Sequence, residues 1–511
     1  MKKVLLSILL MLIPILASAE KVEIKGIWYN LIEKSHVAEV TYGNWDVYSS
    51  TYYYYQDDER YTGDITIPAS IEYDGIIWNI KTIGLNAFRD CQLLKSISLP
   101  KGLVSIGVCA FYGCKSLKTI TIPETVNQID AAAFRGCKGL TKVYISDLMA
   151  WLNIKFGDNY FSSPHEANPL TNGKHLFLNG VEIKDLVIPE GVSTIGDFAF
   201  DGCEGLTSVK IPNGVTSIGY GAFSYCNGIT NINIPNSVTS INHLAFEGCT
   251  GLTSVSIPNS VTDIGENVFA GCSNLYSLEL SQAINHIKRY SFFDCSSLKS
   301  IIIPNSVTMI SGSAFQNCIS LKSLTIGNGI KIISRYSYES GAFENCKELT
   351  DVYCLAENVP NTDADAFKNS MIEYATLHVP SKSVNDYKAA EPWKYFSDIV
   401  PINEESLDRC ATPEISYANG KISLSCETEG VEFISKVTVE DAKDYYDSEF
   451  TLSQTYKITV YATKAGYENS DVATREIAIE NGQSLLFGDL NKDGKVNVAD
   501  HVKLSDIIMN K

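Results

Sequence analysis

A short phrase, Ala-Phe-x-x-Cys or a near copy of it, occurs eleven times between Phe88 and Phe367. Within two unbroken runs, neighbouring cysteines are 23 residues apart. A fixed period of this length is typical of a solenoid, in which each short unit buries its apolar side against its neighbours. The repeat therefore determines the architecture of most of the chain. Ten copies keep the cysteine: Cys91, Cys114, Cys137, Cys203, Cys226, Cys249, Cys272, Cys295, Cys318 and Cys346.

The repeat that ends at Cys226 shows how one unit is expected to fold. Val209 and Ile211 alternate around Lys210, which is the period of a short strand with one buried face. Pro212 ends that strand, because proline cannot donate a hydrogen bond to a ladder. A second short apolar segment follows, and a small and a large side chain close the coil. These further buried positions are Val215, Ile218, Ala222 and Phe223.

The regular cysteines suggest disulfides at first sight, and the geometry of stacking argues against them. Equivalent residues in stacked coils lie about 5 Å apart at Cα, which a disulfide tolerates. Because equivalent Cβ vectors are parallel, however, the Cβ atoms keep that spacing, which is longer than the roughly 3.8 Å of a bridge. We therefore expect a column of free thiols that pack as small buried hydrophobic groups.

The pattern Cys-x-x-Leu-x-x-Val-x-Ile-Pro-x-x-Val-x-x-Ile-x-x-x-Ala-Phe resembles the BspA-like subfamily of leucine-rich repeats, found on bacterial surface and secreted proteins. The resemblance covers residues 64 to about 403 and implies a protein-binding or adhesive surface without naming a ligand. The sequence differs from the better known leucine-rich repeat in lacking an asparagine after the strand. The expected fold is mainly β: a solenoid of 23-residue units, then a small β-sandwich and a calcium-loop helical tail.

The solenoid is interrupted at about residues 146–185, which do not follow the repeat. This segment contains Trp151, Phe156 and Tyr160, and residues 175–181 predict a hairpin with an Asn-Gly turn. We interpret it as an excursion from the coil. Two roles remain open: a binding loop, since long loops are often functional, or a segment whose aromatic side chains pack on the flank of the solenoid.

Both ends of a solenoid need covers, because the terminal coils would otherwise expose apolar faces. Residues 20–63 are expected to form the N-terminal cap, with a hairpin from residues 27–31 and 37–42. The C-terminal cap begins at about residue 371. It is expected to contain a last strand at 375–380 and a covering helix at 384–396.

The residue between the two buried positions of each strand varies most from coil to coil, and forms the natural recognition surface if the strands make one parallel sheet. The alternative is that these residues are merely solvated. The column is Ser98, Thr121, Tyr144, Val187, Lys210, Asn233, Ser256, Glu279, Ile302, Thr325 and Tyr353. The candidate partner-binding residues among them are Tyr144, Lys210, Asn233, Glu279 and Tyr353.

Residues 1–19 have the organisation of a secretory signal peptide: two lysines, an apolar run, and Ala17-Ser18-Ala19 as a cleavage site. We expect export to the cell surface or the medium, with no membrane span. The formal net charge of −18 disfavours nucleic acid and anionic membranes as partners.

Beyond the solenoid, residues 404–481 predict a β-sandwich that resembles fibronectin-type-III-associated modules. Asn419-Gly420 lies between two alternating segments and predicts a two-residue hairpin loop. Cys410 and Cys426 flank this hairpin. A disulfide between them remains open, because a straight strand leaves them roughly 10 Å apart whereas a bend at Pro413 closes the gap.

The last segment, residues 482–511, contains a calcium-loop pattern. Oxygen-bearing side chains occupy loop positions 1, 3, 5, 9 and 12, with glycine at position 6 and a backbone carbonyl at position 7. The expected ligands are Asp489, Asn491, Asp493, Lys495, Asn497 and Asp500. The loop resembles a dockerin repeat, which implies calcium and a cohesin-like partner contacted by Val498 and Ala499. Dockerins normally carry two repeats, and a lone calcium-stapled tail is the alternative.

The sequence predicts a non-enzymatic extracellular binding or adhesion protein with a protein or glycan ligand. The seven histidines form no paired metal motif, and neither a Gly-x-Ser-x-Gly nor a phosphate-cradling glycine loop is present. Two alternatives remain: a component or enzyme of a polysaccharide-degrading cohesin-dockerin assembly, which the tail suggests, and a spacer that only presents the tail.

Overall fold

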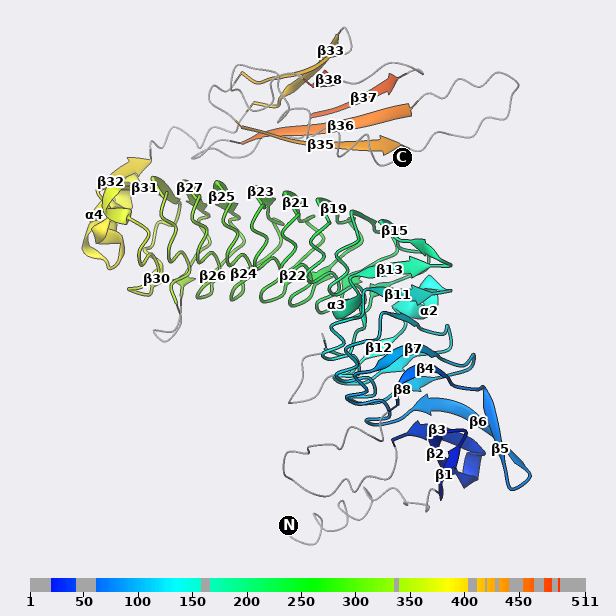
Figure 1. Cartoon of the computed structure of the whole chain (residues 1–511). Helices are drawn as coiled ribbons and strands as arrows, with labels where there is room; N and C mark the ends of the chain where they lie inside the picture. Colours follow the sequence, from blue (N-terminus) through cyan, green and yellow to red (C-terminus); the bar gives the residue numbers. More distant parts are fainter. Residues whose placement is uncertain are drawn as a thin grey trace, which may run out of the picture. The chain divides into compact units, whose positions relative to one another are not determined.

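A computed structural model of the chain describes residues 20–42, 61–157, 166–334 and 340–402, and, further on, 411–418, 421–427, 432–440, 454–463, 473–479 and 486–487. It divides into two compact units, Met1–Leu275 with Lys288–Cys295, and Tyr276–Ile287 with Ser296–Lys511 (Figure 1). The predicted signal peptide and the predicted calcium loop lie outside the described residues.

Each regular coil contributes two short strands, and each strand pairs in parallel with its equivalent in the next coil. In the first unit, Val209 of one strand lies opposite Ile232 of the next, so side chains of one type stay in line. One sheet contains β15 (Asp185–Val187), β17 (Ser208–Lys210), β19 (Asn231–Asn233) and β21 (Ser254–Ser256). The other contains β16 (Thr194–Ile195), β18 (Ser217–Ile218), β20 (Ser240–Ile241) and β22 (Asp263–Ile264).

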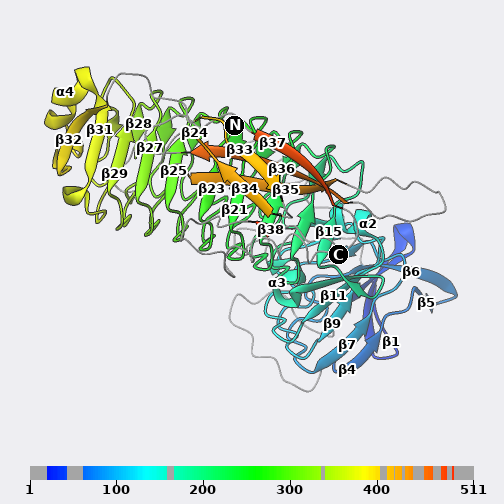
Figure 2. The ribbon, with the colours of Figure 1, turned by 90° about the horizontal axis from the view of Figure 1, so that it is seen from above.

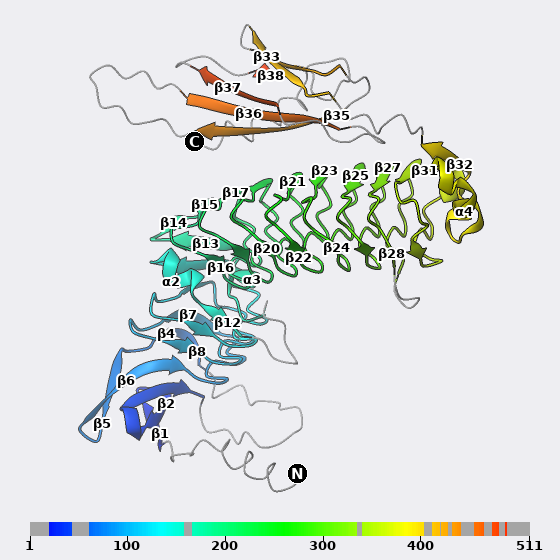
Figure 3. The same cartoon turned by 180° about the vertical axis from the view of Figure 1, so that it is seen from behind.

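The second unit has the same two-sheet arrangement, seen from above in Figure 2 and from behind in Figure 3. One sheet contains β25 (Ser300–Ile303), β27 (Ser323–Ile326), β29 (Asp351–Cys354), β31 (Thr376–Pro380) and β32 (Asp398–Ile402), and β23 (Ser277–Glu279) packs beside β25. The other contains β24 (His286–Ile287), β26 (Met309–Ile310), β28 (Ile332–Ile333) and β30 (Asn361–Thr362).

The N-terminal part of the first unit is a cap that continues into the coils. Its predicted hairpin is confirmed, since β2 (Ile27–Ile32) and β3 (Val37–Thr41) pair antiparallel, with β1 (Glu20–Ile24) on the outer side. The strand β3 then pairs in parallel with the next strand, which joins the cap to the solenoid ladder. That ladder is β6 (Ile76–Ile83), β8 (Ser105–Ile106), β10 (Gln128–Ile129) and β12 (Lys155–Phe156), with β5 (Ser70–Tyr73) paired to β6. The matching strands on the other side are β4 (Gly63–Thr66), β7 (Leu94–Ser98), β9 (Thr119–Thr121), β11 (Lys142–Ile145), β13 (His175–Leu178) and β14 (Val181–Glu182).

Columns of phenylalanine rings form the centre of both units. In the first unit the rings of Phe223 and Phe246 lie 5.6 Å apart and 5° from parallel, and both side chains are fully buried. In the second unit Phe315 and Phe343 have the same relation at 5.3 Å. Rings at this separation bury large apolar areas and attract each other in an offset stack. The repeated Ala-Phe pair is therefore the main apolar contact from coil to coil.

The cysteines of the repeat form the expected column of free thiols. The thiols pair with main-chain carbonyls: Cys226 Sγ donates a hydrogen bond to the carbonyl of Phe200 in the preceding coil at 3.1 Å, and Cys249 Sγ donates to Phe223 O in the same way. Burial raises the pKa of the Cys249 thiol to about 12. Where the last copy has Ser370 instead, its hydroxyl donates to Phe343 O, so the position needs a small donor rather than sulfur itself.

The repeat also requires left-handed backbone conformations, which the apolar pattern does not indicate. Most coils have a left-handed residue directly before the Ala-Phe pair, such as Cys109 (φ 54°), and another directly before the repeat cysteine, such as Gly113 (φ 73°). Glycine, asparagine and aspartate tolerate this conformation best, and they dominate the second position. These two reversals turn the chain between its two sheets.

The interruption after Cys137 does not leave the coil, contrary to the prediction. The strand β13 pairs with β11 in parallel, and β12 pairs with β10, so the segment supplies its own strands to both ladders. The predicted hairpin is nevertheless present, since β13 also pairs antiparallel with β14. Two short helices lie between these strands: α2 (Leu148–Leu152) between β11 and β12, and α3 (Leu170–Gly173) before β13.

In this segment, where the repeat cysteine is missing, asparagine side chains donate hydrogen bonds to main-chain carbonyls of the neighbouring coils. Asn172 Nδ2 donates to Phe134 O at 3.0 Å, which is the acceptor that a repeat thiol would otherwise use. The fully buried Asn168 donates to Phe198 O at 2.6 Å. Trp151 is also buried and donates from its indole to Ala199 O, so this aromatic residue packs inside rather than in a binding loop. Tyr160 lies outside the described residues.

The C-terminal cap differs from its prediction in the helix and in one extra strand. The predicted helix at 384–396 is divided into α4 (Val384–Ala389) and a 3-10 turn, η6 (Trp393–Tyr395), because Pro392 disfavours helical conformation in the residue before it. The chain then forms β32, which the sequence did not suggest, in parallel with β31. The indole of Trp393 donates to Thr362 Oγ1 at 3.1 Å, which fixes the cap on the last coil.

The strands that follow form two small sheets. One contains β33 (Glu414–Ala418), β34 (Lys421–Ser425) and β38 (Leu486–Phe487), and the other β35 (Glu432–Glu440), β36 (Gln454–Thr463) and β37 (Ala473–Ile479). The predicted two-residue hairpin is confirmed, with Ala418 opposite Lys421. Cys426 Sγ donates to Ala411 O at 3.1 Å, while Cys410 lies outside the described residues.

The thiol column makes a direct prediction for reagent accessibility. The ten repeat cysteines should be inert to a thiol reagent such as dithionitrobenzoate in the native protein, because they are buried and protonated. Unfolding in guanidinium without reductant should expose at least ten reactive groups. The partly exposed Cys109 and Cys426 should react in the native protein, and Cys109→Ser should remove the part of that signal that comes from Cys109. No new thiols on unfolding would mean that the column is bonded.

The same column predicts a loss of stability in alkaline solution. Burial raises the pKa of Cys203, Cys249 and Cys346 to about 12, from an ordinary value of 9.0. Above pH 9 the unfolded chain loses thiol protons that the native state keeps, so stability is complete below pH 9 and falls from pH 9 towards pH 12. Each thiol contributes up to about 1.4 kcal/mol per pH unit. Thermal melts should show this fall, with a smaller slope for Cys249→Ser; equal melting temperatures at pH 8 and pH 10.5 would contradict it.

Candidate ligand-binding surface

The middle residues of the longer parallel strands form an exposed surface on each unit, which we call the strand face. Strand geometry produces it, because the residues on either side point into the core: Val209 and Ile211 are 6% and 5% exposed, whereas Lys210 between them is exposed. In the first unit the strand face is Ser98, Thr121, Tyr144, Phe177, Val187, Lys210, Asn233 and Ser256. In the second it is Glu279, Ile302, Tyr353, His378 and Val400.

Two of the candidate residues are direct neighbours in the first unit. The parallel register places Lys210 between Val187 and Asn233 on adjacent strands. All three are exposed, and Val187 leaves 57% of its surface in solvent although it is aliphatic. A cation, an amide and an exposed apolar side chain therefore lie in one row, which offers mixed contacts to a partner.

The same unit has an aromatic pair on the sheet that contains β9, β11 and β13. Tyr144 on β11 lies opposite Phe177 on β13, with ring centroids 4.9 Å apart. Lys142 Nζ lies 5.4 Å from the centroid of the Phe177 ring, so a cation approaches the ring as well. Both aromatic side chains are half-buried. They present large apolar surfaces whose conformations are already restricted by each other.

The second unit has an equivalent pair. Tyr353 on β29 stacks on His378 of β31, with ring centroids 4.2 Å apart and planes 7° from parallel. His378 Nε2 lies 3.6 Å from Asp351 Oδ1, so an acidic group borders the pair. Glu279 lies on β23 of the same unit and is half-buried.

The predicted exposure is wrong for one residue of the column. Thr325 was expected to be exposed and is only 4% exposed. The register places it directly between Ile302 and Tyr353 on the two adjacent strands. A small side chain between two large ones loses its access to solvent, although its position on the strand is the same as theirs.

Sequence reasoning also missed three strand-face residues: Phe177, His378, and Val400 on the unpredicted strand β32. Phe177 belongs to the segment interpreted as an excursion, so its strand was not aligned with the repeats. His378 belongs to the last strand, which was treated as part of the cap. The signal was present for Phe177 and His378: each lies in an alternating run, His175-Leu176-Phe177-Leu178 and Thr376-Leu377-His378-Val379.

The structure brings some candidate residues together and leaves others apart. Lys210 and Asn233 are neighbours, Tyr144 lies on a different sheet of the same unit, and Glu279 and Tyr353 belong to the second unit. The tail candidates lie outside the described residues; they are Asp489, Asn491, Asp493, Lys495, Asn497, Val498, Ala499 and Asp500.

Two features are absent from the described part of the chain. Over these residues, His, Cys, Asp and Glu side chains form no group of three or more that is suited to a metal ion. None of the helices described is long and apolar enough to cross a membrane.

The strand face is suited to recognising a macromolecular surface. Aromatic side chains dominate the energetics of protein interfaces, and polar residues around them set orientation. Both elements are present here on regular, rigid strands. The fold defines the class: a parallel two-sheet solenoid of leucine-rich repeats with a strand face on each unit.

The comparison with family models agrees with this class. The model described as "BspA type Leucine rich repeat region" matches residues 68–164, 171–276, 217–341 and 262–390, which together are more than half of the chain. The chain therefore belongs to the BspA-type leucine-rich repeat proteins. No curated protein matches it.

Several solved structures are similar to the chain. A leucine rich cell surface protein from Faecalibacterium prausnitzii is 25% identical, with 66% of this chain and 95% of that chain covered and a TM-score of 0.39. A leucine-rich repeat protein from Bacteroides ovatus is 23% identical, with 74% and 99% covered and a TM-score of 0.42. The pneumococcal vaccine antigen PcpA is 17% identical, with 75% and 99% covered and a TM-score of 0.49.

Proposed function

We propose that this chain is a non-enzymatic extracellular binding protein that recognises a protein ligand through its strand face. The observation that supports this most directly is the pair of half-buried aromatic contacts, Tyr144 with Phe177 and Tyr353 with His378. In each pair the two rings contact each other across neighbouring strands, so little side-chain freedom is lost when a partner covers them. The membership of the BspA-type repeat family is consistent with a binding role.

Export is part of the proposal. The segment 1–19 supplies the charge, the apolar run and the small residues that a signal peptidase requires. Outside the cell, a column of thiols survives only if oxidants cannot reach it, and the repeat cysteines of the described coils are buried. The burial of these thiols is therefore compatible with an oxidising environment.

The C-terminal segment is proposed to bind calcium and to dock. The spacing of oxygen-bearing residues from Asp489 to Asp500 supports the calcium site, and its similarity to a dockerin repeat supports a cohesin-like partner at Val498 and Ala499. The strands at 414–479 are proposed to be a fibronectin-type-III-associated module between the solenoid and this tail.

The strand face can be tested once a partner has been captured from host matrix and bacterial surface extracts. The double variant Tyr144→Ala with Phe177→Ala should weaken binding by at least tenfold, about 1.4 kcal/mol, because aromatic anchors carry much of an interface's affinity. Lys210→Ala with Asn233→Ala should weaken it further. Surface plasmon resonance gives the affinity. Thr194→Ala is the control and should bind with wild-type affinity, because Thr194 is exposed on β16, outside the strand face.

Thermal melts complete this test. The Lys210 and Asn233 variant should lose no more than about 1 kcal/mol of stability, since exposed cross-strand pairs contribute about 0.2–1 kcal/mol. The Tyr144 and Phe177 variant truncates two half-buried rings, so it should lose more stability but remain folded. Unchanged affinity in folded variants of both strand-face pairs would exclude this surface as the binding site.

Calcium binding can be measured by titration calorimetry on the full chain after treatment with a chelator. We expect one site with a dissociation constant of about 10⁻⁷ to 10⁻⁵ M, the range of calcium loops in sensors. Asp489→Ala with Asp493→Ala should abolish the heat, because two carboxylate ligands are lost. Asp471→Ala, an acidic residue outside the loop, should leave it unchanged. A wild-type chain that gives no heat would remove the calcium site from the proposal.

A further inference from the structure

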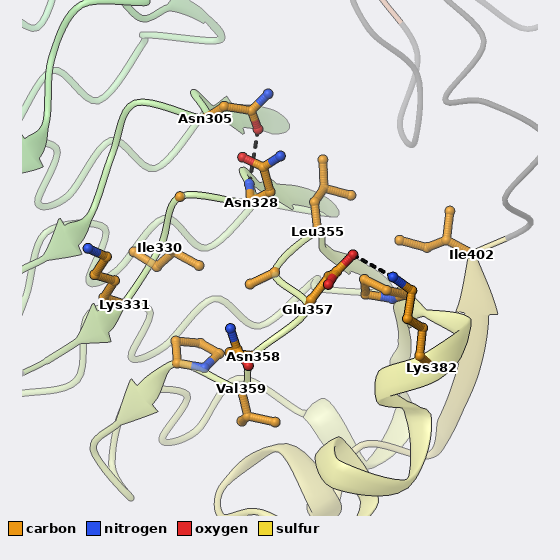
Figure 4. Close-up of a pocket in the computed structure, with 14 residues that line it drawn as sticks. Asn305, Asn328, Ile330, Lys331, Leu355, Glu357, Asn358, Val359, Lys382 and Ile402 are labelled. Atoms are coloured by element: carbon orange, nitrogen blue, oxygen red, sulfur yellow. Dashed lines mark hydrogen bonds and ion pairs between the residues drawn. The ribbon is translucent and has the colours of Figure 1, made fainter.

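A groove on the flank of the second unit is separate from the strand face. Its volume is about 780 Å³, and Figure 4 shows the residues that line it. The turns that follow successive strands form one side, and the C-terminal cap, through Lys382 and Ile402, forms the other. We call it the flank groove. Strand-face residues do not line it, so it is an independent site.

Three asparagines from consecutive coils place their amides at this groove: Asn305, Asn328 and Asn358. All three are exposed. Asn305 Oδ1 accepts a hydrogen bond from the backbone N–H of Asn328 at 3.0 Å, which orders the first turn against the second (Figure 4). Within the part of the chain described, the side-chain amides of Asn328 and Asn358 have no hydrogen-bond partner, so both remain available to a ligand.

The groove contains a neutralised charge pair. Lys382 Nζ lies 2.8 Å from Glu357 Oε1, and the two side chains meet inside the groove (Figure 4). Ser383 donates to the Glu357 carbonyl, which holds the loop that carries Asn358 against the cap. Lys331 points away from this pair in Figure 4. The groove therefore offers strong hydrogen-bonding groups without a dominant charge for an ionic ligand.

The rest of the lining is aliphatic. It comes from Ile330, Leu355, Ala356, Val359 and Pro360. Among the described residues that line the groove there is neither an aromatic ring nor an arginine, the residues that anchor protein partners. Its volume lies within the usual range of small-molecule sites, about 300–1,000 Å³, in which a few amides fix the orientation of a ligand on apolar walls.

We propose that the flank groove binds a short segment of a neutral carbohydrate. A sugar hydroxyl both donates and accepts hydrogen bonds, and an asparagine amide does the same with its N–H₂ group and its oxygen. Three such amides in neighbouring coils suit successive hydroxyls of one chain, while the aliphatic wall suits the C–H faces of the rings. An extended peptide also pairs with amides, but the described lining residues provide no aromatic or arginine anchor for its side chains.

The test uses the full chain and defined probes: tetrasaccharides of β-1,4-linked glucose, xylose and mannose and of α-1,4-linked glucose, with tetraalanine as the peptide probe. Saturation-transfer NMR and titration calorimetry should detect at least one tetrasaccharide at millimolar concentration and no tetraalanine. Asn328→Ala and Asn358→Ala should each weaken that binding about tenfold, the effect of one lost hydrogen bond of about 1.4 kcal/mol.

The chain provides a matched control in Asn236→Ala. Asn236 is an exposed asparagine in the same Pro-Asn-Ser turn as Asn305, but it belongs to the first unit and does not line the groove. It should bind sugar as the wild type does. Three results would each overturn the proposal. They are failure of all four tetrasaccharides to bind, wild-type sugar affinity in the Asn328 and Asn358 variants, and binding of tetraalanine with the same affinity as a tetrasaccharide. The strand-face variants should retain sugar binding, so the two proposals fail separately.

Discussion

Each internal coil of this protein buries its apolar face against the coil before it and the coil after it, and the terminal coils pack on the caps. The contact is concentrated in one column of phenylalanine rings, in which Phe223 and Phe246 are fully buried and nearly parallel. Burying such a side chain contributes about 1.5–3 kcal/mol. Because this contribution exists only when equivalent residues are aligned, the length of a coil cannot drift freely. The 23-residue period is the consequence of that alignment.

Stacking also decides where function can lie. The interior is filled by phenylalanine, thiol and aliphatic side chains, so binding depends on surfaces that the stack leaves outside. Two such surfaces arise from different parts of the same coil. The strands present side chains such as Tyr353 in a flat row, and the turns after them present amides such as Asn328 in a groove. A change in one surface does not require a change in the other, since they use different positions of the repeat.

The sequence predicted much of this fold because the coil is specified locally. Strand alternation around Lys210, the role of Pro212 and the free state of Cys226 follow from one repeat and from general geometry. The left-handed residues, such as Cys109, were not predicted, because they change the backbone without changing the apolar pattern.

The predictions were wrong where tertiary contacts, rather than the residue type expected from the repeat, determine the local structure. Asn172 takes the hydrogen-bonding role of a thiol, so the segment after Cys137 keeps the coil without resembling it. Thr325 is buried by its neighbours rather than by its own position in the strand. Of the candidate site, the row from Lys210 to Asn233 was predictable from period alone. The partners Phe177 and His378 required the register of irregular coils, and the flank groove required the three-dimensional arrangement of its turns.

The thiol column has an implication for how proteins of this kind change in evolution. Throughout the coils described, each cysteine is unbonded, and a thiol such as that of Cys249 pairs with a main-chain carbonyl that every coil possesses. Duplication or deletion of one coil therefore leaves no cysteine without its acceptor and creates no mismatched bridge during oxidative export. The length of the strand face can change by whole coils through a single genetic event, with the interior chemistry unaltered.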